Sequence, residues 1–279
     1  MPVLCLGRFI MANELRIRQG AHNLSAADAS ALRTAYAKMM ALADNDNRSW
    51  FAHAGVHGDP GHYCWHYQGS DKSALNMELF LPWHRAYLYN FEMAVRDQVA
   101  NATLPWWDWT LRPPRQNGIP TIFSDRTVGQ NPNPLYGFKI DTRVGPESDA
   151  GPHQTTRHPG PPNGLPTQAK VNKVLQLTDW NEFSDNLEDV HDHVHGWVSG
   201  DMGIINLAAF DPLFWSHHCM VDRVWWLWQA RNGNGNIPTD LLDQVLAPFN
   251  MQVRDVLNVN DLGYDYAAGN SVDIPGGGG

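Results

Sequence analysis

The chain has 279 residues, of which 43% are hydrophobic, and a formal net charge of -9 at pH 7. This length predicts one large domain or two small ones, and the acidic balance argues against nucleic acid or an anionic membrane as the main partner. No apolar run approaches the ~20 residues of a membrane-spanning helix, and three cysteines make no disulfide framework. The first residues lack the basic stretch and cleavage site of a secretory signal, which favours a cytoplasmic location.

Two helices are predicted in the first half of the chain. Residues 25–43 repeat large apolar side chains at helical spacing, and Ser25 is a suitable N-cap in front of them. Residues 82–99 predict a second helix, with Pro82 in its first turn. The segment PWWDWT at 105–110 then closes this half.

Residues 112–166 differ sharply from both flanks. They hold eleven of the nineteen prolines together with many Gly, Asn and Asp, which predicts a long irregular excursion. Short strands are expected at 121–123 and 137–140. A linker between two domains would have a similar composition. An ordered surface loop is favoured, because the histidines described below are divided between the two flanks.

Helical patterning returns at 168–200, and a further helix is predicted from Pro212 to about Arg231. Asp211 suits the N-cap of this helix and Pro212 suits its first position. The run NGNGN at 232–236 is a strong helix end.

Ten of the thirteen histidines fall in two stretches, within 51–92 and 188–222. Neutral imidazole is a common ligand of late first-row metals, so the two stretches predict two metal ions close together. In the second stretch, His191 and His195 are four residues apart and project from one face of a helix. His218 is the candidate third ligand. Three histidines leave a coordination position open, as a catalytic metal requires.

Some neighbours of these histidines are expected to stay off the metal. His193 faces another side of its helix. His217 and His218 diverge by about 100° on a helix, so only one of them should serve this metal. Asp222 follows four residues after His218. It is expected to orient an imidazole or to hold Arg85 or Arg223, with an ordinary helix ion pair as the alternative.

The first stretch offers more candidates than one metal needs. His84 lies early in its predicted helix, and His57 lies in the turn-like GVHG. Cys64 stands two residues before His66, where it is either a ligand or a small buried hydrophobe. His53 would share a face with His57 if that segment is helical.

Longer segments around these histidines carry a family resemblance. FLPWHRAYLYNFE resembles the copper-A signature of the tyrosinase family, and DPLFWSHHCMVD resembles its copper-B signature. VHDHVHGWVSG is similar to a third family segment, LPWWDWT is typical of the family, and LGYDY at 262–266 resembles the tyrosine motif that ends its catalytic domain. The resemblance runs from about Arg16 to Tyr266.

The resemblance implies a mainly α fold, in which a helical bundle holds a dinuclear copper site among long irregular loops and a few short strands. It implies a single catalytic domain over 1–279 with a core at about 16–266. No C-terminal shielding domain is expected, which favours an open site, and the glycine-rich residues 275–279 are expected to be disordered.

The resemblance also assigns copper ligands. Copper B would take His191, His195 and His218, and copper A would take His84 as its third ligand. Most members have another histidine nine residues before the one at His84, but this chain has Leu75 there. An insertion before FLPWHR is therefore implied.

The other two copper-A ligands follow from fungal members of the family. GVHG is similar to their first-ligand context, which favours His57. Cys64 and His66 resemble a Cys-x-His segment in which a thioether joins the cysteine to the ligand histidine. His53 and His62 remain alternatives.

Three further residues resemble functional positions of the family. Glu188 looks like the glutamate that holds a water near copper B, with a solvated acid as the alternative. Asp192 stands where many tyrosinases have an asparagine linked to deprotonation of monophenols, which puts the hydroxylase strength in doubt. Phe214 should pack beside the copper site.

The function implied is that of a tyrosinase or catechol oxidase with two copper ions, copper A and copper B. It would use O2 to oxidise o-diphenols to o-quinones and to hydroxylate monophenols. The alternatives are an o-aminophenol oxidase and a hemocyanin-like oxygen carrier. A small phenol is the expected partner and a copper chaperone is a further candidate, whereas the oligomeric state has no sequence signal.

Overall fold

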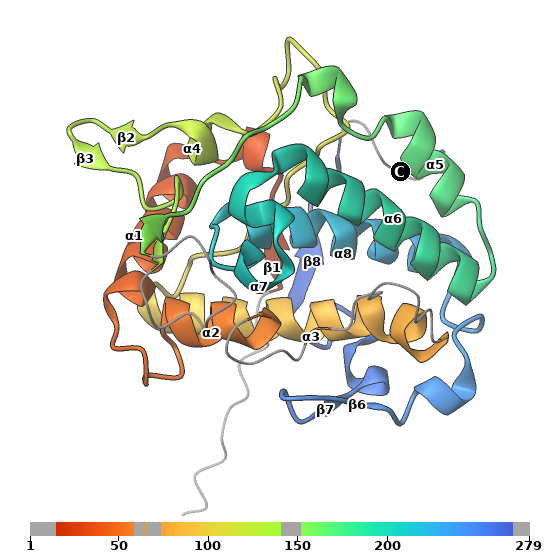
Figure 1. The fold of residues 1–279 in the computed structure, drawn as a ribbon. Helices are drawn as coiled ribbons and strands as arrows, with labels where there is room; N and C mark the ends of the chain where they lie inside the picture. The colour runs from red at the N-terminus through yellow and green to blue at the C-terminus, as the bar shows by residue number, and fades with distance from the viewer. Residues whose placement is uncertain (1–14, 59–63, 65–73, 141–151, 270–279) are drawn as a thin grey trace, which may run out of the picture.

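The computed structural model describes residues 15–58, 64, 74–140 and 152–269. This part of the chain is mainly helical, with short paired strands around the helices (Figure 1). The α-helices are α1 Ala26–Ala41, α2 Trp50–His57, α3 Ala74–Gln98, α4 Thr121–Ser124, α5 Gln168–Leu175, α6 Trp180–Val198, α7 Ile205–Ala208 and α8 Leu213–Asn232. The strands are β1 Arg16–Arg18, β2 Thr127–Val128, β3 Asn131–Pro132, β4 Lys139–Ile140, β5 His153–Gln154, β6 Val245–Leu246, β7 Met251–Gln252 and β8 Tyr264–Tyr266. The mainly α fold expected from the sequence is confirmed.

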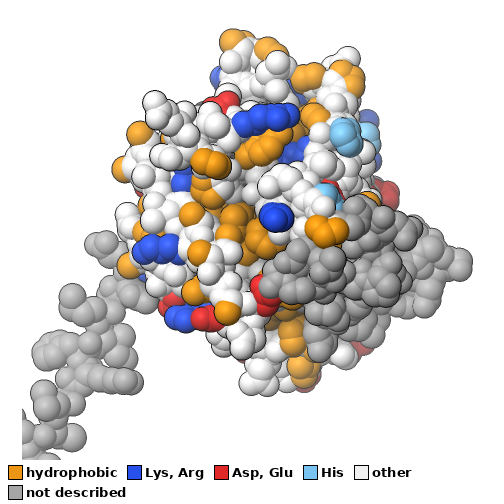
Figure 2. All heavy atoms as spheres, turned by 60° about the vertical axis from the view of Figure 1, so that its left-hand side comes forward, with side chains coloured by type: hydrophobic (Ala, Val, Ile, Leu, Met, Phe, Trp, Pro, Cys, Tyr) orange, Lys and Arg blue, Asp and Glu red, His pale blue; other side chains and the backbone are white. Residues whose placement is uncertain are grey.

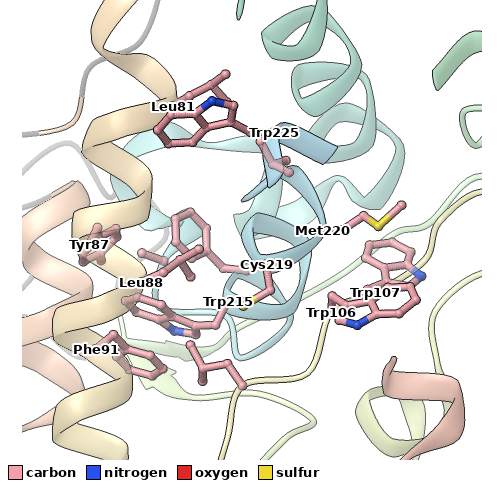
Figure 3. Packing of buried hydrophobic residues seen from close by; sticks show 14 of the residues in the cluster. Leu81, Tyr87, Leu88, Phe91, Trp106, Trp107, Trp215, Cys219, Met220 and Trp225 are labelled. Atoms are coloured by element: carbon pink, nitrogen blue, oxygen red, sulfur yellow. The ribbon is translucent and has the colours of Figure 1, made fainter. Parts of the chain in front are cut away.

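Three long helices form the centre of the bundle. α3 packs against α6 and α8, α1 lies on α3, and α5 covers α6 and α8 (Figure 1). The core between the helices is unusually aromatic: the Phe91 ring of α3 stacks on the Trp215 ring of α8 at 3.4 Å between centroids (Figure 3). Such stacked aromatics bury large areas in a fixed geometry. They hold α3 and α8 in one register, and the histidines of both helices with them.

The two ends of the described chain meet in one small sheet. β1 pairs with β8 in parallel, with Arg16 opposite Tyr264 and Arg18 opposite Tyr266. Two 3-10 turns lie beside the long helices: η3 Gly200–Gly203 follows α6, and η5 Val253–Val256 lies against α3. The remaining 3-10 turns are η1 Ala21–Asn23, η2 Pro162–Gly164 and η4 Thr239–Leu241.

The ends predicted for α1 and α8 agree with the structure to within two residues. Ser25 caps α1, its Oγ accepting from the Asp28 N–H at 3.1 Å. α8 ends at Gly233, whose φ of 67° suits a glycine. At its start, Pro212 rather than Asp211 occupies the N-cap, but the Asp211 carboxylate still accepts from the Leu213 N–H at 2.8 Å.

The predicted start of the second helix was wrong. α3 begins at Ala74, so Pro82 lies inside the helix and not in its first turn. A proline inside a helix removes one backbone hydrogen bond. Here the apolar residues just before it, Leu79, Phe80 and Leu81, are all buried. Their burial outweighs the local preference for a break.

The excursion at 112–166 is ordered where the structure describes it, at 112–140 and 152–166. The expected strand at 137–140 is present as β4, which pairs with β5. The strand expected at 121–123 was wrong, because those residues form the single helical turn α4. Pro120 precedes this turn, and its carbonyl accepts from Phe123 N and Ser124 N.

The surface drawn in Figure 2 shows hydrophobic side chains gathered in the middle of that face, with basic and acidic side chains interspersed around them. Among the described residues, no helix is both long enough and apolar enough to span a bilayer.

Candidate metal centre

Four histidines from two helices converge in the core. The ligand atoms of His191 and His195 on α6, and of His217 and His218 on α8, all lie within 4.8 Å of one another. The Nε2 atom of His218 lies 3.2 Å from Nε2 of His191 and 3.4 Å from Nε2 of His195. The helical spacing predicted from the sequence therefore brings together the three histidines assigned to copper B.

Oxygen acceptors fix the orientation of the two rings on α6. His195 Nδ1 donates to the Met202 carbonyl at 2.6 Å, and His191 Nδ1 donates to the Asp192 carboxylate at 3.0 Å. Because these oxygens accept, the ring proton lies on Nδ1 and the lone pair of Nε2 faces the centre. A hydrogen bond of this kind is the usual support of a metal-binding histidine.

The donor set fits a metal ion. Nitrogens bound to one tetrahedral metal at about 2.0–2.1 Å lie about 3.3–3.4 Å apart, close to the two Nε2 separations at His218. Burial, followed by the neighbouring imidazoles, holds the pKa of His218 well below its ordinary value, so the ring is neutral. Neutral nitrogen lone pairs that face one another in a buried site repel unless a cation lies between them.

His217 is oriented differently from the other three. The Trp109 indole N–H donates to His217 Nδ1 at 3.2 Å, so Nδ1 carries no proton. Burial holds the pKa of His217 well below its ordinary value, so the neutral ring carries its proton on Nε2. Neither nitrogen then has a free lone pair for a metal. This supports the prediction that only His218 of the adjacent pair is a ligand.

A second group of histidines lies next to the first. The ligand atoms of His57, His84 and His218 also lie within 4.8 Å of one another, and the His84 and His218 rings stack at 4.5 Å. His57 Nδ1 donates to the Ile205 carbonyl at 3.2 Å, and His84 Nδ1 donates to the Phe80 carbonyl at 2.8 Å. The structure thus brings together two of the three predicted copper-A ligands.

Of the other histidines considered for copper A, only His53 lies among the described residues. His53 shares α2 with His57, but its ring packs edge-on against Phe91 at 5.5 Å, and it belongs to neither histidine group. His62 and His66 lie outside the described residues. The predicted thioether between Cys64 and His66 does as well.

Two phenylalanines line the centre. The Phe214 ring lies 4.1 Å from the His218 ring and 4.8 Å from the His57 ring, so it packs beside the predicted ligands as expected. The Phe80 ring lies between His84, at 4.6 Å, and His191, at 5.0 Å. The sequence did not single out Phe80. Its place one helical turn before His84 was the available signal.

The other predicted residues have distinct surroundings. Glu188 is buried on α6, one turn before His191, whereas the Asp192 side chain is exposed. Cys64 is half-buried, and burial raises the pKa of its thiol to about 12. The thiol is therefore protonated at neutral pH.

Asp222 does not touch an imidazole within the described contacts. Its carboxylate accepts from Arg85 Nε at 2.5 Å and from Arg18 Nη1 at 3.3 Å. The hydroxyls of Tyr264 and Tyr266 also donate to it. Of the two arginines suggested by the sequence, Arg85 is its partner. Arg18 was not foreseen because it lies 204 residues away.

A pocket opens beside the histidines. Its volume is about 240 Å³. Asp192 and Ile205 belong to its exposed rim. Its lining residues are His57, His191, Asp192, His195, Gly196, Met202, Gly203, Ile205 and Ala208. The histidines assigned to both coppers thus border one pocket that reaches the surface.

A helical bundle with two adjoining groups of histidines suits a dinuclear metal centre held by imidazoles. A family model for the common central domain of tyrosinase matches residues 47–231. The chain is 31% identical over 173 residues to a tyrosinase of Streptomyces lincolnensis, a match that covers 55% of this chain and 63% of that protein. It is 30% identical over 214 residues to hemocyanin 1 of Megathura crenulata, covering 68% of this chain and 6% of that protein.

Among solved structures, the tyrosinase from Burkholderia thailandensis is similar in fold, with a TM-score of 0.79 at 24% identity over 93% of this chain and 75% of that chain. The chain belongs to the tyrosinase family of type 3 copper proteins. This chain spans less than two thirds of each of these two relatives, 63% of the Streptomyces protein and 6% of hemocyanin 1.

Proposed function

We propose that this protein is a copper oxidase that uses O2 to oxidise o-diphenols to o-quinones and also hydroxylates monophenols. The observation that carries the proposal is the pocket beside the histidines. It is concave, largely apolar and bordered by the histidines of both groups, as expected of a small-molecule site. An oxygen carrier has no need of a pocket for a phenol at its metal centre.

The reaction balances with O2 alone. Two o-diphenols release four electrons and four protons, and these reduce one O2 to two waters. When bound, a copper pair supplies the binding of O2 and the transfer of electrons. The His218 imidazole would hold its metal as a neutral ring that does not take up a proton, because burial and the neighbouring rings keep its pKa low.

Two carboxylates of α6 lie close to His191 in the sequence. Glu188 is buried one turn from His191, so a water that it holds would be a base for a phenolic proton. Asp192 lies on the pocket rim and binds His191 Nδ1. Its negative charge favours neutral or cationic phenols over phenolic acids, because like charges repel.

The alternative is a hemocyanin-like oxygen carrier, because the chain is about as similar to a hemocyanin as to a tyrosinase. The test is oxygen uptake by the copper-loaded protein with tyrosine, catechol, L-DOPA and o-aminophenol. We expect about two copper ions per chain. We also expect oxygen uptake with tyrosine, catechol and L-DOPA. Reversible O2 binding without uptake would favour the carrier, and uptake with o-aminophenol alone would favour the aminophenol oxidase.

Two variants control this experiment. His218→Ala removes a nitrogen that belongs to both histidine groups, so it should lose copper and uptake together. His193→Ala changes an exposed histidine on α6 whose ring nitrogen donates to the Gly164 carbonyl, so the variant should keep both copper and uptake. Full activity in His218→Ala would contradict the assignment.

A further inference from the structure

Residues 202–205 accept hydrogen bonds from two histidines that are assigned to different coppers. His195 Nδ1 donates to the Met202 carbonyl at 2.6 Å, and His57 Nδ1 donates to the Ile205 carbonyl at 3.2 Å. The two carbonyls are three residues apart on one short segment, made of η3 and the start of α7. Their position therefore sets the direction of two Nε2 lone pairs at once.

Asp201 ties this segment to the excursion. Its side chain is buried, and its Oδ2 accepts from the Thr156 N–H at 2.7 Å and the Thr156 hydroxyl at 2.9 Å. Its Oδ1 accepts from His153 Nε2 at 2.7 Å. The Asp201 N–H in turn donates to the Thr156 carbonyl at 3.1 Å. Both oxygens of the carboxylate thus hold residues that are some 45 positions away.

The backbone in front of Asp201 needs this support. Ser199 has a φ of 54°, which is unfavourable for a residue other than glycine, and Gly200 follows with a φ of 61°. Such conformations persist only where the surrounding contacts hold them. A Cβ at Gly200 would overlap the Thr156 carbonyl, so the turn and residue 156 are in close contact.

We propose that Asp201 is a positioning residue of the metal centre. By anchoring the turn after α6 to Thr156 and His153, it fixes the Met202 and Ile205 carbonyls and through them the rings of His195 and His57. The irregular excursion thereby helps to build a site that lies between helices. This role is the same whether the centre oxidises phenols or carries O2, so it stands or falls independently of the proposed activity.

The test uses the full chain with Asp201→Ala, Asp201→Asn and the milder Thr156→Val. In the metal-free protein, ¹⁵N NMR of the imidazoles reports which ring nitrogen carries the proton. Asp201→Ala should produce mixed protonation of both His57 and His195. His84 should not change, because its Nδ1 donates to Phe80 of its own helix. With a competing chelator, the copper dissociation constant should rise about 10- to 100-fold, the usual effect of removing such a support.

Val171→Ala is the matched control. It opens a cavity in the buried face of α5, which packs on α6 and α8 away from the 202–205 segment. It should lower the melting temperature but leave the ring protonation of both histidines unchanged. The proposal is overturned if Asp201→Asn and Thr156→Val fold but change neither the ring protonation of His57 and His195 nor the copper affinity. A response confined to His195 would overturn the claim that one segment serves both groups.

Discussion

One hydrogen bond at Nδ1 decides which nitrogen of a histidine faces the centre. His57, His84 and His195 each donate to a backbone carbonyl. His217 instead accepts from Trp109, and this reverses its ring. His217 and His218 are adjacent on α8 and both are buried in the same histidine group, but the hydrogen bond from Trp109 leaves only His218 as a predicted ligand.

The choice between His53 and His57 gives a prediction at this scale. His57→Ala should lower the copper content toward one ion per chain, because it removes a nitrogen from the second histidine group. His53→Ala should keep both ions. Its imidazole packs on Phe91, and the contact that Tyr87 makes with residue 53 uses the backbone carbonyl, which the variant retains. Copper content by mass spectrometry measures the difference, and loss of copper only in His53→Ala would reverse the assignment.

Helices bring the predicted ligands together in pairs. Spacing along α6 places His191 and His195 on one face, and the stacked aromatics between α3 and α8 place His84 against His218. At Pro82, the local preference for a helix start and the burial of the preceding residues favour different structures, and the burial determines the course of the helix. Pro82 marks a helix start by its own preference, yet α3 continues through it because the turn before it is apolar and buried.

The end of α8 gives a prediction at the scale of an element. Gly233 has a φ of 67° and a ψ of −164°, a region that is essentially restricted to glycine. Gly233→Ala should therefore lower the free energy of unfolding by about 1–3 kcal/mol. No described atom lies within 4 Å of a Cβ added there, so the cost is conformational and not steric.

Gly235→Ala is the control for this substitution. A Cβ there also meets no described atom, and the backbone does not have a positive φ. Denaturant unfolding of both variants measures the difference. Equal losses in the two variants would mean that the conformation of Gly233 does not stabilise the helix end.

At the scale of the whole molecule, a buried charge network joins the two ends of the described chain to the bundle. Arg18 of β1 binds Glu92 of α3 at 2.9 Å, and Asp222 of α8 binds both Arg18 and Arg85. Burial alone would raise the pKa of Asp222, but Arg85 and Arg18 outweigh it and hold that pKa below its ordinary value. The carboxylate is therefore charged in the folded chain.

Removing this charge should destabilise the protein. Asp222→Asn keeps the shape of the side chain but leaves two buried guanidinium groups without their shared partner, which should cost about 3–5 kcal/mol of unfolding free energy. A carboxyl with a lowered folded pKa stabilises the fold at pH values above its unfolded pKa, and this is lost as the pH falls through the folded pKa. The variant should therefore lose less stability on acidification than the parent chain.

Asp46→Asn is the control, because the pair of Asp46 with Arg48 lies at the surface. Exposed pairs of this kind add little to stability. Unfolding curves in denaturant at several acidic pH values compare the two. A loss in Asp222→Asn no larger than in Asp46→Asn would show that the network does not stabilise the fold.

The sequence by itself determined what depends on residues close together in the chain. The helical spacing of His191 and His195, the cap of α1, the end of α8 and the copper signatures all involve near neighbours, so their local pattern carries the information. The family and the mainly α fold followed from these segments and are confirmed.

Only the tertiary structure decided which candidates point at the centre. Trp109 reverses His217 across 108 residues, and the Ile205 carbonyl orients His57 across 148. Asp201 reaches Thr156 across 45. A backbone carbonyl has no sequence signal, since every residue supplies one. Its role as an acceptor arises only when folding brings it beside a particular ring.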